Sequence, residues 1–196
     1  MSTWLLALML TVAAAVVVIF FVNDKIYGPE HQVSSYLTAL KEGDGERALG
    51  LLAAKVPAAN AALLDGDGLR ASAAGLEVLE IAEPRDTGGN RVDVDVRYSL
   101  GGEEGTSTYR LERTDKHWLF FDRWSFVPST LPTLTVTSLG QPEASVNGVP
   151  VALAGDTTTF AAFYPAQVEA SYTSEFFAAP AQSGTLASSR IRRTWC

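Results

Sequence analysis

A run of apolar residues from Trp4 to Val22 constrains this chain more than any other feature. Thr11 is its only polar residue, and no charge precedes Asp24. As a helix, at about 1.5 Å per residue, the run spans about 28 Å, close to the hydrocarbon core of a bilayer. A helix apolar on every side would otherwise need burial all round. The run therefore predicts a membrane-spanning segment that includes Trp4, Leu5, Leu6, Val16, Val17, Val18, Ile19, Phe20, Phe21 and Val22.

A cleaved signal peptide is the alternative interpretation of this run. Its start carries no Lys or Arg, and the small residues Ala13 to Ala15 lie in its middle. A signal peptide has a basic start, a shorter apolar stretch and small residues after that stretch. The sequence favours an uncleaved anchor. Lys25 weakly indicates a cytoplasmic location for the residues after the run, whereas the architecture of those residues indicates an external one.

The charge balance argues against a nucleic-acid binder. The net charge is −7 and the pI is about 4.8, so the chain lacks the basic balance that neutralises phosphates. The local basic cluster of Arg190, Arg192 and Arg193 is typical of a solvated end. The single cysteine, Cys196, excludes an intrachain disulfide and a zinc site built on several thiolates of one chain.

The residues after the apolar run predict helices first. Pro29 suits a first helical turn, and Val33, Tyr36, Leu37 and Leu40 follow helical spacing. The segment 43–45 breaks this helix, and Asp44 is a good N-cap for a second one. A third short helix is expected at 58–64, before a turn at 65–68.

The period then changes from helical to two, which indicates strands. In the segment 91–100, Val92, Val94 and Val96 alternate with Asp93 and Asp95. Further strands are expected at 76–81, 106–113 and 118–127, with a loop at 84–90. Helices followed by antiparallel strands with one polar face predict an α+β fold in which a curved sheet wraps around helices.

The remainder of the chain has the pattern of a linker and a small all-β unit. Pro128 and Pro132 mark the linker, and strands are expected at 133–139, 143–146, 149–153, 157–163, 167–173 and 184–192. Asn147-Gly148 is a strong hairpin signal, because both turn positions need positive φ. The predicted organisation is a transmembrane anchor at 1–25, an α+β domain at 26–128 and a small all-β domain at 129–196.

The segment SYLTALKEGDGERALGLL (35–52), together with HWLFFDRWSFV (117–127), resembles the nuclear-transport-factor-2-like, or cystatin-like, superfamily. The whole arrangement also resembles membrane-anchored bacterial envelope proteins that carry such a domain outside the membrane, teicoplanin-resistance-associated membrane proteins among them. The resemblance implies a cone of helices on a curved sheet and an external, non-catalytic role. Some members of the superfamily are isomerases or cyclases that use a carboxylate or histidine inside the cone.

Asp122 is the most interesting candidate carboxylate. It lies in phase with Trp118 and Trp124, so it becomes a buried acid if that face turns inward. The alternatives are an ion pair or a position at the rim of the sheet. Asp93 and Asp95 are expected on the solvated face, opposite Arg110. His31 and His117 lack an acidic neighbour at the spacing of a catalytic triad or metal site.

Two further patterns allow both a functional and an ordinary structural interpretation. The DGDG segment 65–68 resembles the start of a calcium loop, but the later ligands do not follow, so a turn is expected. Phe176 and Phe177 would suit either core packing or a surface patch.

The sequence thus favours a non-enzymatic, single-pass envelope protein that acts as a binding or assembly module, without cofactor or metal. Its expected partners are the lipid bilayer and an envelope protein or cell-wall component. The alternative is a ligand-binding or isomerase-like domain that uses Asp122, Trp118 and Trp124 in the cone. A filled core favours the first function, and an apolar pocket with a convergent carboxylate favours the second.

Overall fold

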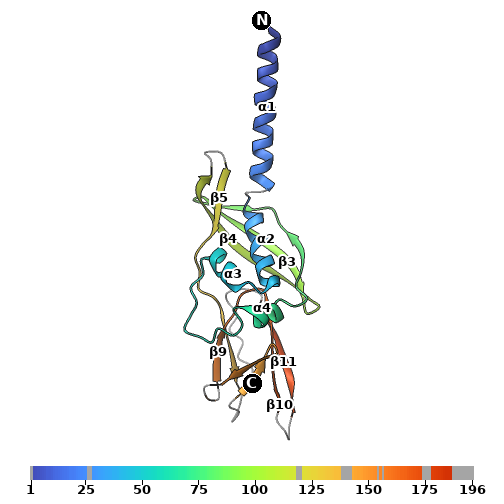
Figure 1. The fold of residues 1–196 in the computed structure, drawn as a ribbon, viewed down its shortest axis with the longest axis vertical. Coiled ribbons are helices and arrows are strands. Elements are labelled where there is room, and N and C mark those ends of the chain that lie inside the picture. The colour runs from blue at the N-terminus through green and yellow to red at the C-terminus, as the bar shows by residue number, and fades with distance from the viewer. Residues whose placement is uncertain are drawn as a thin grey trace.

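The computed structural model describes residues 2–25, 28–117, 121–137, 143–153, 155, 157–173 and 178–186. The helix α1 (Ser2–Lys25) leads into an elongated body in which helices pack against a curled sheet, and further strands lie at the far end (Figure 1). We refer to residues 28–128 as the first part and to residues 129–186 as the second part.

Three helices open the first part: α2 (Pro29–Glu42), α3 (Gly45–Leu52) and α4 (Gly66–Ser72). Pro29 begins α2, and Gly43 ends it in the left-handed conformation, with φ of 73°. The Asp44 carboxylate accepts a hydrogen bond of 2.9 Å from the Arg47 N–H and so caps α3. These two helix boundaries agree with the sequence prediction. The helix predicted at 58–64 is wrong, because the helical turn begins only at Gly66.

The sheet of the first part is antiparallel, in the order β1-β3-β4-β5, with β2 also paired to β3. Its strands are β1 (Glu77–Ile81), β2 (Arg85–Gly88), β3 (Arg91–Leu100), β4 (Glu103–His117) and β5 (Phe121–Phe126). The alternation in β3 places Val92, Val94 and Val96 in the core, as predicted. The loop predicted at 84–90 is wrong, because β2 forms there and pairs with the start of β3.

The described residues of the second part form two small sheets. One has the order β11-β10-β7-β8, and the other pairs β6 with β9. The strands are β6 (Thr133–Thr137), β7 (Glu143–Val146), β8 (Val149–Ala152), β9 (Thr157–Ala161), β10 (Ala166–Thr173) and β11 (Ala178–Leu186). The predicted hairpin at Asn147-Gly148 is confirmed, with φ of 50° and 77°. The last strand begins earlier than the 184–192 that the sequence predicted.

The two parts share their cores. The main core lies between the helices and the curled sheet, yet it also contains Leu131, Ala161, Phe163 and Tyr164 of the second part. Conversely, Leu63 of the first part is fully buried in the core of the second part. Each part therefore depends on the other for the burial of its apolar side chains.

The predicted α+β class needs correction. The structure is mostly β, with 44% strand and 29% helix, and its sheet is curled. The balance shifts because β4 extends over 15 residues and β2 forms where a loop was expected. The sequence pattern underestimated the number and the lengths of the strands in the first part.

The predicted membrane anchor is also wrong. Among the described residues, no helix combines the length and hydropathy required to cross a membrane. The membrane-spanning assignment of Trp4, Leu5, Leu6, Val16, Val17, Val18, Ile19, Phe20, Phe21 and Val22, and the single-pass cell-membrane location built on it, are therefore withdrawn.

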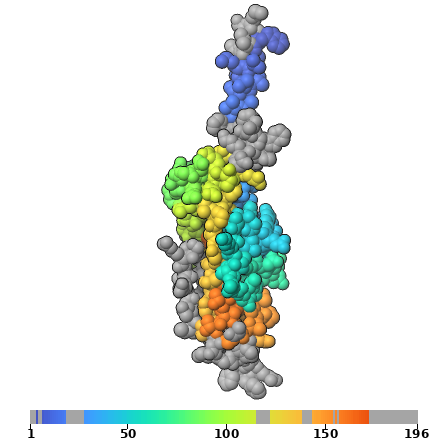
Figure 2. Space-filling model, turned by 90° about the vertical axis from the view of Figure 1, so that its left-hand side faces the viewer, coloured from blue at the N-terminus to red at the C-terminus, as the bar shows by residue number. Residues whose placement is uncertain are grey.

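The described side chains of α1 stand clear of the body (Figure 2). Trp4 is 82% exposed and Met9 is 75% exposed. The helix contains alanine, leucine and methionine, which are good helix formers, and it lacks Gly and Pro. The Thr11 hydroxyl donates to the Ala7 carbonyl one turn earlier.

Candidate functional site

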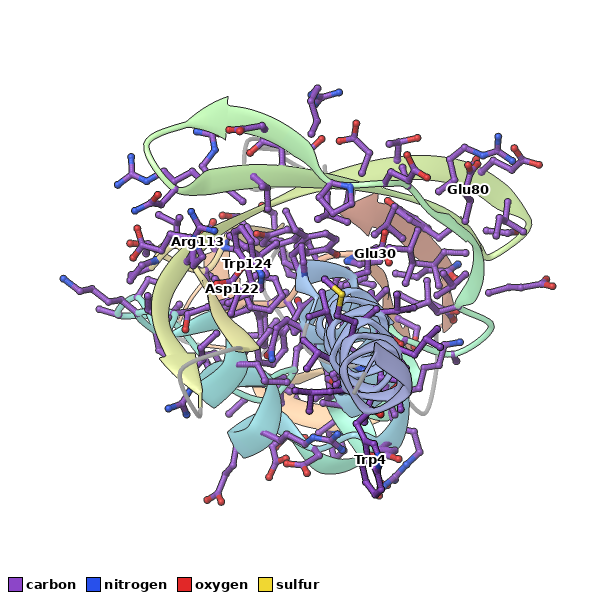
Figure 3. All side chains as sticks on the ribbon, turned by 90° about the horizontal axis from the view of Figure 1, so that it is seen from above. Trp4, Glu30, Glu80, Arg113, Asp122 and Trp124 are labelled. Atoms are coloured by element: carbon purple, nitrogen blue, oxygen red, sulfur yellow. The ribbon has the colours of Figure 1, made fainter. Side chains whose placement is uncertain are left out.

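The candidate carboxylate Asp122 lies near the start of β5, where that strand pairs with the end of β4. A bulge between Arg113 and Asp115 shifts the register of this pairing. Nη1 of Arg113 approaches Oδ2 of Asp122 to 3.3 Å, and the Arg113 guanidinium also lies 5.9 Å from the centre of the Trp124 ring. Figure 3 shows Arg113, Trp124 and Asp122 together at one side of α1. Trp118 lies outside the described residues.

The face that carries Asp122 does turn inward. Phe126 is buried, and Trp124 packs partly against the main core. The Asp122 side chain keeps 19% exposure and is held by Arg113, whose own side chain is 41% exposed. The carboxylate is therefore a member of an ion pair at the rim of the sheet, and not an isolated acid in apolar surroundings. An Arg–carboxylate pair over an aromatic ring suits structural support of the β4–β5 hairpin.

The interior of the curled sheet is filled by aromatic side chains. Tyr36 of α2, Tyr109 of β4, Phe126 of β5 and Phe163 lie edge to face, with ring centres 5.6 to 6.2 Å apart. The Tyr164 ring stacks on Tyr109 at 5.5 Å and an interplanar angle of 8°. Phe163 and Tyr164 belong to the second part, so the chain itself occupies the concave side of the sheet.

The polar ends of this aromatic cluster are used internally. The hydroxyls of Tyr36 and Tyr109 both donate to the backbone carbonyl of Tyr164, at 2.8 and 3.1 Å. Burial raises the pKa of Tyr36 and Tyr109 well above the ordinary tyrosine value. Both phenols therefore stay neutral at physiological pH and act as hydrogen-bond donors. The sequence analysis placed Tyr36 on the apolar face of its helix but could not find the distant carbonyl that Tyr36 shares with Tyr109.

Asp93 and Asp95 lie on the outer face of the sheet. Arg110 donates from Nε and Nη2 to the two Asp93 oxygens at 2.7 and 2.9 Å, which confirms the predicted cross-strand pairing. The hydrogen bonds from Arg110 hold the pKa of Asp93 below its usual range. Asp93 is less solvated than expected, since its side chain is only 9% exposed. Asp95 accepts hydrogen bonds from Thr108 and Arg85.

The DGDG segment is a structural turn. The Asp65 carboxylate accepts a hydrogen bond of 2.9 Å from the Gly45 N–H, and Asp67 pairs with Arg70. No group of side chains suited to hold a metal ion occurs among the described residues. His31 is exposed on α2. The His117 side chain, Phe176, Phe177, Arg190, Arg192, Arg193 and Cys196 fall outside what the structure describes.

A polar junction between the two parts was missed by the sequence analysis. Nδ2 of Asn147 donates to Oγ of Ser72 at 2.7 Å and to the Gln167 carbonyl at 3.1 Å, while its Oδ1 accepts from the Glu169 N–H at 2.7 Å. The hairpin signal at Asn147 was the available clue, but it predicts backbone geometry and says nothing of the partner on α4.

The chain matches no family model, no curated protein and no solved structure. The resemblance to nuclear-transport-factor-2-like domains therefore stays a prediction from the sequence.

Proposed function

We propose that this chain is a non-enzymatic binding or assembly module, built as one unit from its two parts. The observation that carries the proposal is the occupancy of the curled sheet by the chain's own residues. Tyr36, Tyr109, Phe163 and Tyr164 fill the concave side, and the two phenol hydroxyls that point into it share the Tyr164 carbonyl. A site for a small ligand needs concave space with a few convergent polar groups.

The ion pair of Asp122 with Arg113 gives the proposal further support. A general acid or base must lie within hydrogen-bond reach of its substrate. Asp122 instead pairs with Arg113 on the β4–β5 hairpin, whereas the interior hydroxyls of Tyr36 and Tyr109 gather on the Tyr164 carbonyl. For the alternative, an isomerase-like or ligand-binding site on Asp122 and Trp124, the described residues supply an ion pair with Arg113 in place of a carboxylate that faces a substrate.

The shared cores explain why a module of this kind would be rigid. Backbone hydrogen bonds join Lys55 to Ser129 and Leu131, and Asn60 to Thr159 and Ala161, each between 2.8 and 3.0 Å. Such contacts fix the surface that the second part presents relative to the first. A rigid surface binds a partner at a lower entropic cost than a mobile one.

The test compares wild-type protein with Asp122→Asn, with Asp95→Asn as a matched control on the outer face. Both variants should keep the wild-type near-UV circular dichroism. A binding module predicts that one protein partner co-purifies with the wild type and with both variants, with less than a twofold change in affinity. A small molecule that raises the wild-type melting temperature by several degrees, and fails to do so with Asp122→Asn alone, would contradict the proposal and favour the ligand-binding alternative.

A further inference from the structure

The strand edges of this protein differ in how well they are protected against pairing with other chains. Unpaired edges recruit strands unless a bulge, a proline, a charge or a neighbouring element blocks them. The strand β1 carries a bulge between Val78 and Glu80, β8 contains Pro150, and β11 contains Pro180. The first sheet has two more edges: β2, which is only four residues long and carries Arg85 and Asp86, and β5, which borders α2 and α3. These five edges are poor sites for strand addition.

Among the described residues, β6 itself has none of these protections, and the backbone bonds of Lys55 to Ser129 and Leu131 end before the strand begins. Its sequence from Thr133 to Thr137 is TLTVT, with β-branched residues at four of five positions and without charge or proline. It pairs with β9 in a continuous register from Thr133 opposite Ala161 to Thr137 opposite Thr157. Within the described residues, β9 is the only strand paired to it.

The hydrogen bonds around β9 show which groups of β6 point to its other edge. Asn60 bonds to the Thr159 carbonyl and to the Ala161 N–H, so the backbone groups of these two residues face away from β6. Antiparallel strands alternate between residues that bond to one neighbour and residues that bond to the other. Thr158 and Phe160 therefore bond to β6.

The same alternation fixes the outward groups of β6. Leu134 lies opposite Phe160 and Val136 opposite Thr158. The backbone N–H and C=O groups of Leu134 and Val136 therefore form hydrogen bonds with β9. The Ala162 N–H donates to the Pro132 carbonyl at 3.1 Å, which continues the same alternation one pair earlier in β6. The backbone N–H and C=O groups of Thr133, Thr135 and Thr137 consequently point to the open edge.

We propose that β6 pairs antiparallel with β6 of a second copy of this chain, about a two-fold axis at Thr135. The inference rests on the proposed assembly function and names its partner. In either direction along the strand, the pattern of threonine and aliphatic residues is the same. In this pairing Thr135 faces its own copy, Thr133 faces Thr137, and Leu134 faces Val136. Threonine pairs and aliphatic pairs are both favourable across strands, and no like charges meet.

The burial of the strand fits this geometry. Leu134 and Val136 are 4% and 7% exposed and point into the core of the second part, whereas Thr133, Thr135 and Thr137 are half-exposed on the opposite face. Pairing of the two copies places aliphatic side chains next to each other on the core side and continues the threonine face across the axis. A two-fold interface of this kind closes on itself and does not propagate into fibres.

Disulfide trapping in the full-length chain tests the pairing directly. In a Cys196→Ser background, Thr135→Cys places two thiols across the axis at a Cα separation of about 5.5 Å, within the range that a disulfide spans. Thr159→Cys, on β9 and on the same face, is the matched control, because its two copies would be about three strand spacings apart, roughly 14 Å. Mild oxidation should convert most of the Thr135→Cys protein to a covalent dimer and leave the Thr159→Cys protein without a covalent link between its copies.

Sedimentation velocity at about 50 µM supplies the second measurement. Thr135→Pro removes an outward N–H and leaves the bonds to β9 in place. It should therefore raise the dissociation constant of the dimer at least tenfold, whereas Thr135→Val should leave that constant unchanged. Equal cross-linking at positions 135 and 159, or cross-linking at neither, overturns the inference. If Thr135→Pro does not fold, the cross-linking pair decides. A monomeric chain that still captures a protein partner refutes the β6 pairing and leaves the proposed function standing.

Discussion

The hydroxyl of Tyr36 donates a hydrogen bond of 2.8 Å to the backbone carbonyl of Tyr164, 128 residues further along the chain. Tyr109 donates to the same oxygen at 3.1 Å. One helix and one strand of the first part thus hold one carbonyl of the second part. This shared acceptor connects the two parts more specifically than apolar packing can, because its geometry depends on both donors.

The shared acceptor predicts a non-additive response to mutation. Tyr36→Phe should lower the free energy of unfolding by about 1 kcal/mol, because Tyr109 still satisfies the carbonyl, and Tyr109→Phe should behave alike. The double variant removes both donors and should cost about 3 kcal/mol or more, which exceeds the sum of the single effects. Urea denaturation of the four proteins at neutral pH measures this coupling, and strict additivity would show that the carbonyl is satisfied in another way.

Asp93 should make the protein sensitive to acid. Arg110 lowers the pKa of the native carboxyl, so the unfolded chain binds the proton more tightly than the native chain. The stabilisation is therefore fully present above the unfolded pKa of about 4, and is lost as the pH falls through the lower native value. Asp93→Asn should flatten the dependence of stability on pH below about 4.

Denaturant titrations between pH 2 and pH 6 measure this slope. The matched control is the same substitution in an Arg110→Gln background, where the slope should barely change. An equal change of slope in both backgrounds would assign the acid sensitivity to a different partner.

Two glycines of α3 should respond in opposite ways to alanine. At Gly45 an added Cβ would overlap the Leu64 carbonyl, a backbone atom that cannot move aside, whereas the space at Gly50 is open. Gly45→Ala should destabilise the fold by about 3 kcal/mol. Gly50→Ala should stabilise it by up to about 1 kcal/mol through better helix propensity. Thermal unfolding of both variants tests the packing of α3 against the turn at Leu64, and similar melting temperatures would contradict it.

Asn147 should matter through its side chain more than through its φ of 50°. Asn147→Gly keeps the conformation and removes the hydrogen bonds to Ser72, Gln167 and Glu169, and should cost about 2 kcal/mol. Asn147→Ala should cost about 1 kcal/mol more, because alanine is strained at positive φ. Guanidinium unfolding separates the two contributions. Equal stability of Asn147→Gly and wild type would show that the junction with Ser72 adds nothing.

Local signals accounted for those elements whose geometry the sequence itself determines. Pro29, Gly43 and Asp44 marked helix boundaries correctly, because proline, glycine and a capping carboxylate act on their own backbone. The alternation of Val92, Val94 and Val96 likewise fixed the inner face of β3. Propensity failed at 58–64, where alanines and leucines suited a helix but Asn60 bonds to β9 instead.

Long-range partners were beyond sequence reasoning. The inward face of Asp122 was predicted from its alternation with Trp124. Its ion pair with Arg113 was not, because that pair depends on the β-bulge in β4 that sets the register with β5. The pairing of Asn147 with Ser72 depends on how the second part packs against α4. The apolar run of α1 predicted a membrane span from composition, and the described helix does not bear it out.

The measurement that tests the central claim most directly is native-state hydrogen exchange of the loop that fills the curled sheet. The amides of Ala161 and Ala162, which bond to Asn60 and Pro132, report on the segment that carries Phe163 and Tyr164. If the two parts are one unit with a filled interior, these amides exchange with the same free energy as the amides of α2 around Tyr36 and Leu40. The contradicting result is exchange of Ala161 and Ala162 through a local opening whose free energy is at least about 2 kcal/mol below that of the α2 amides. The interior would then open as a ligand site does.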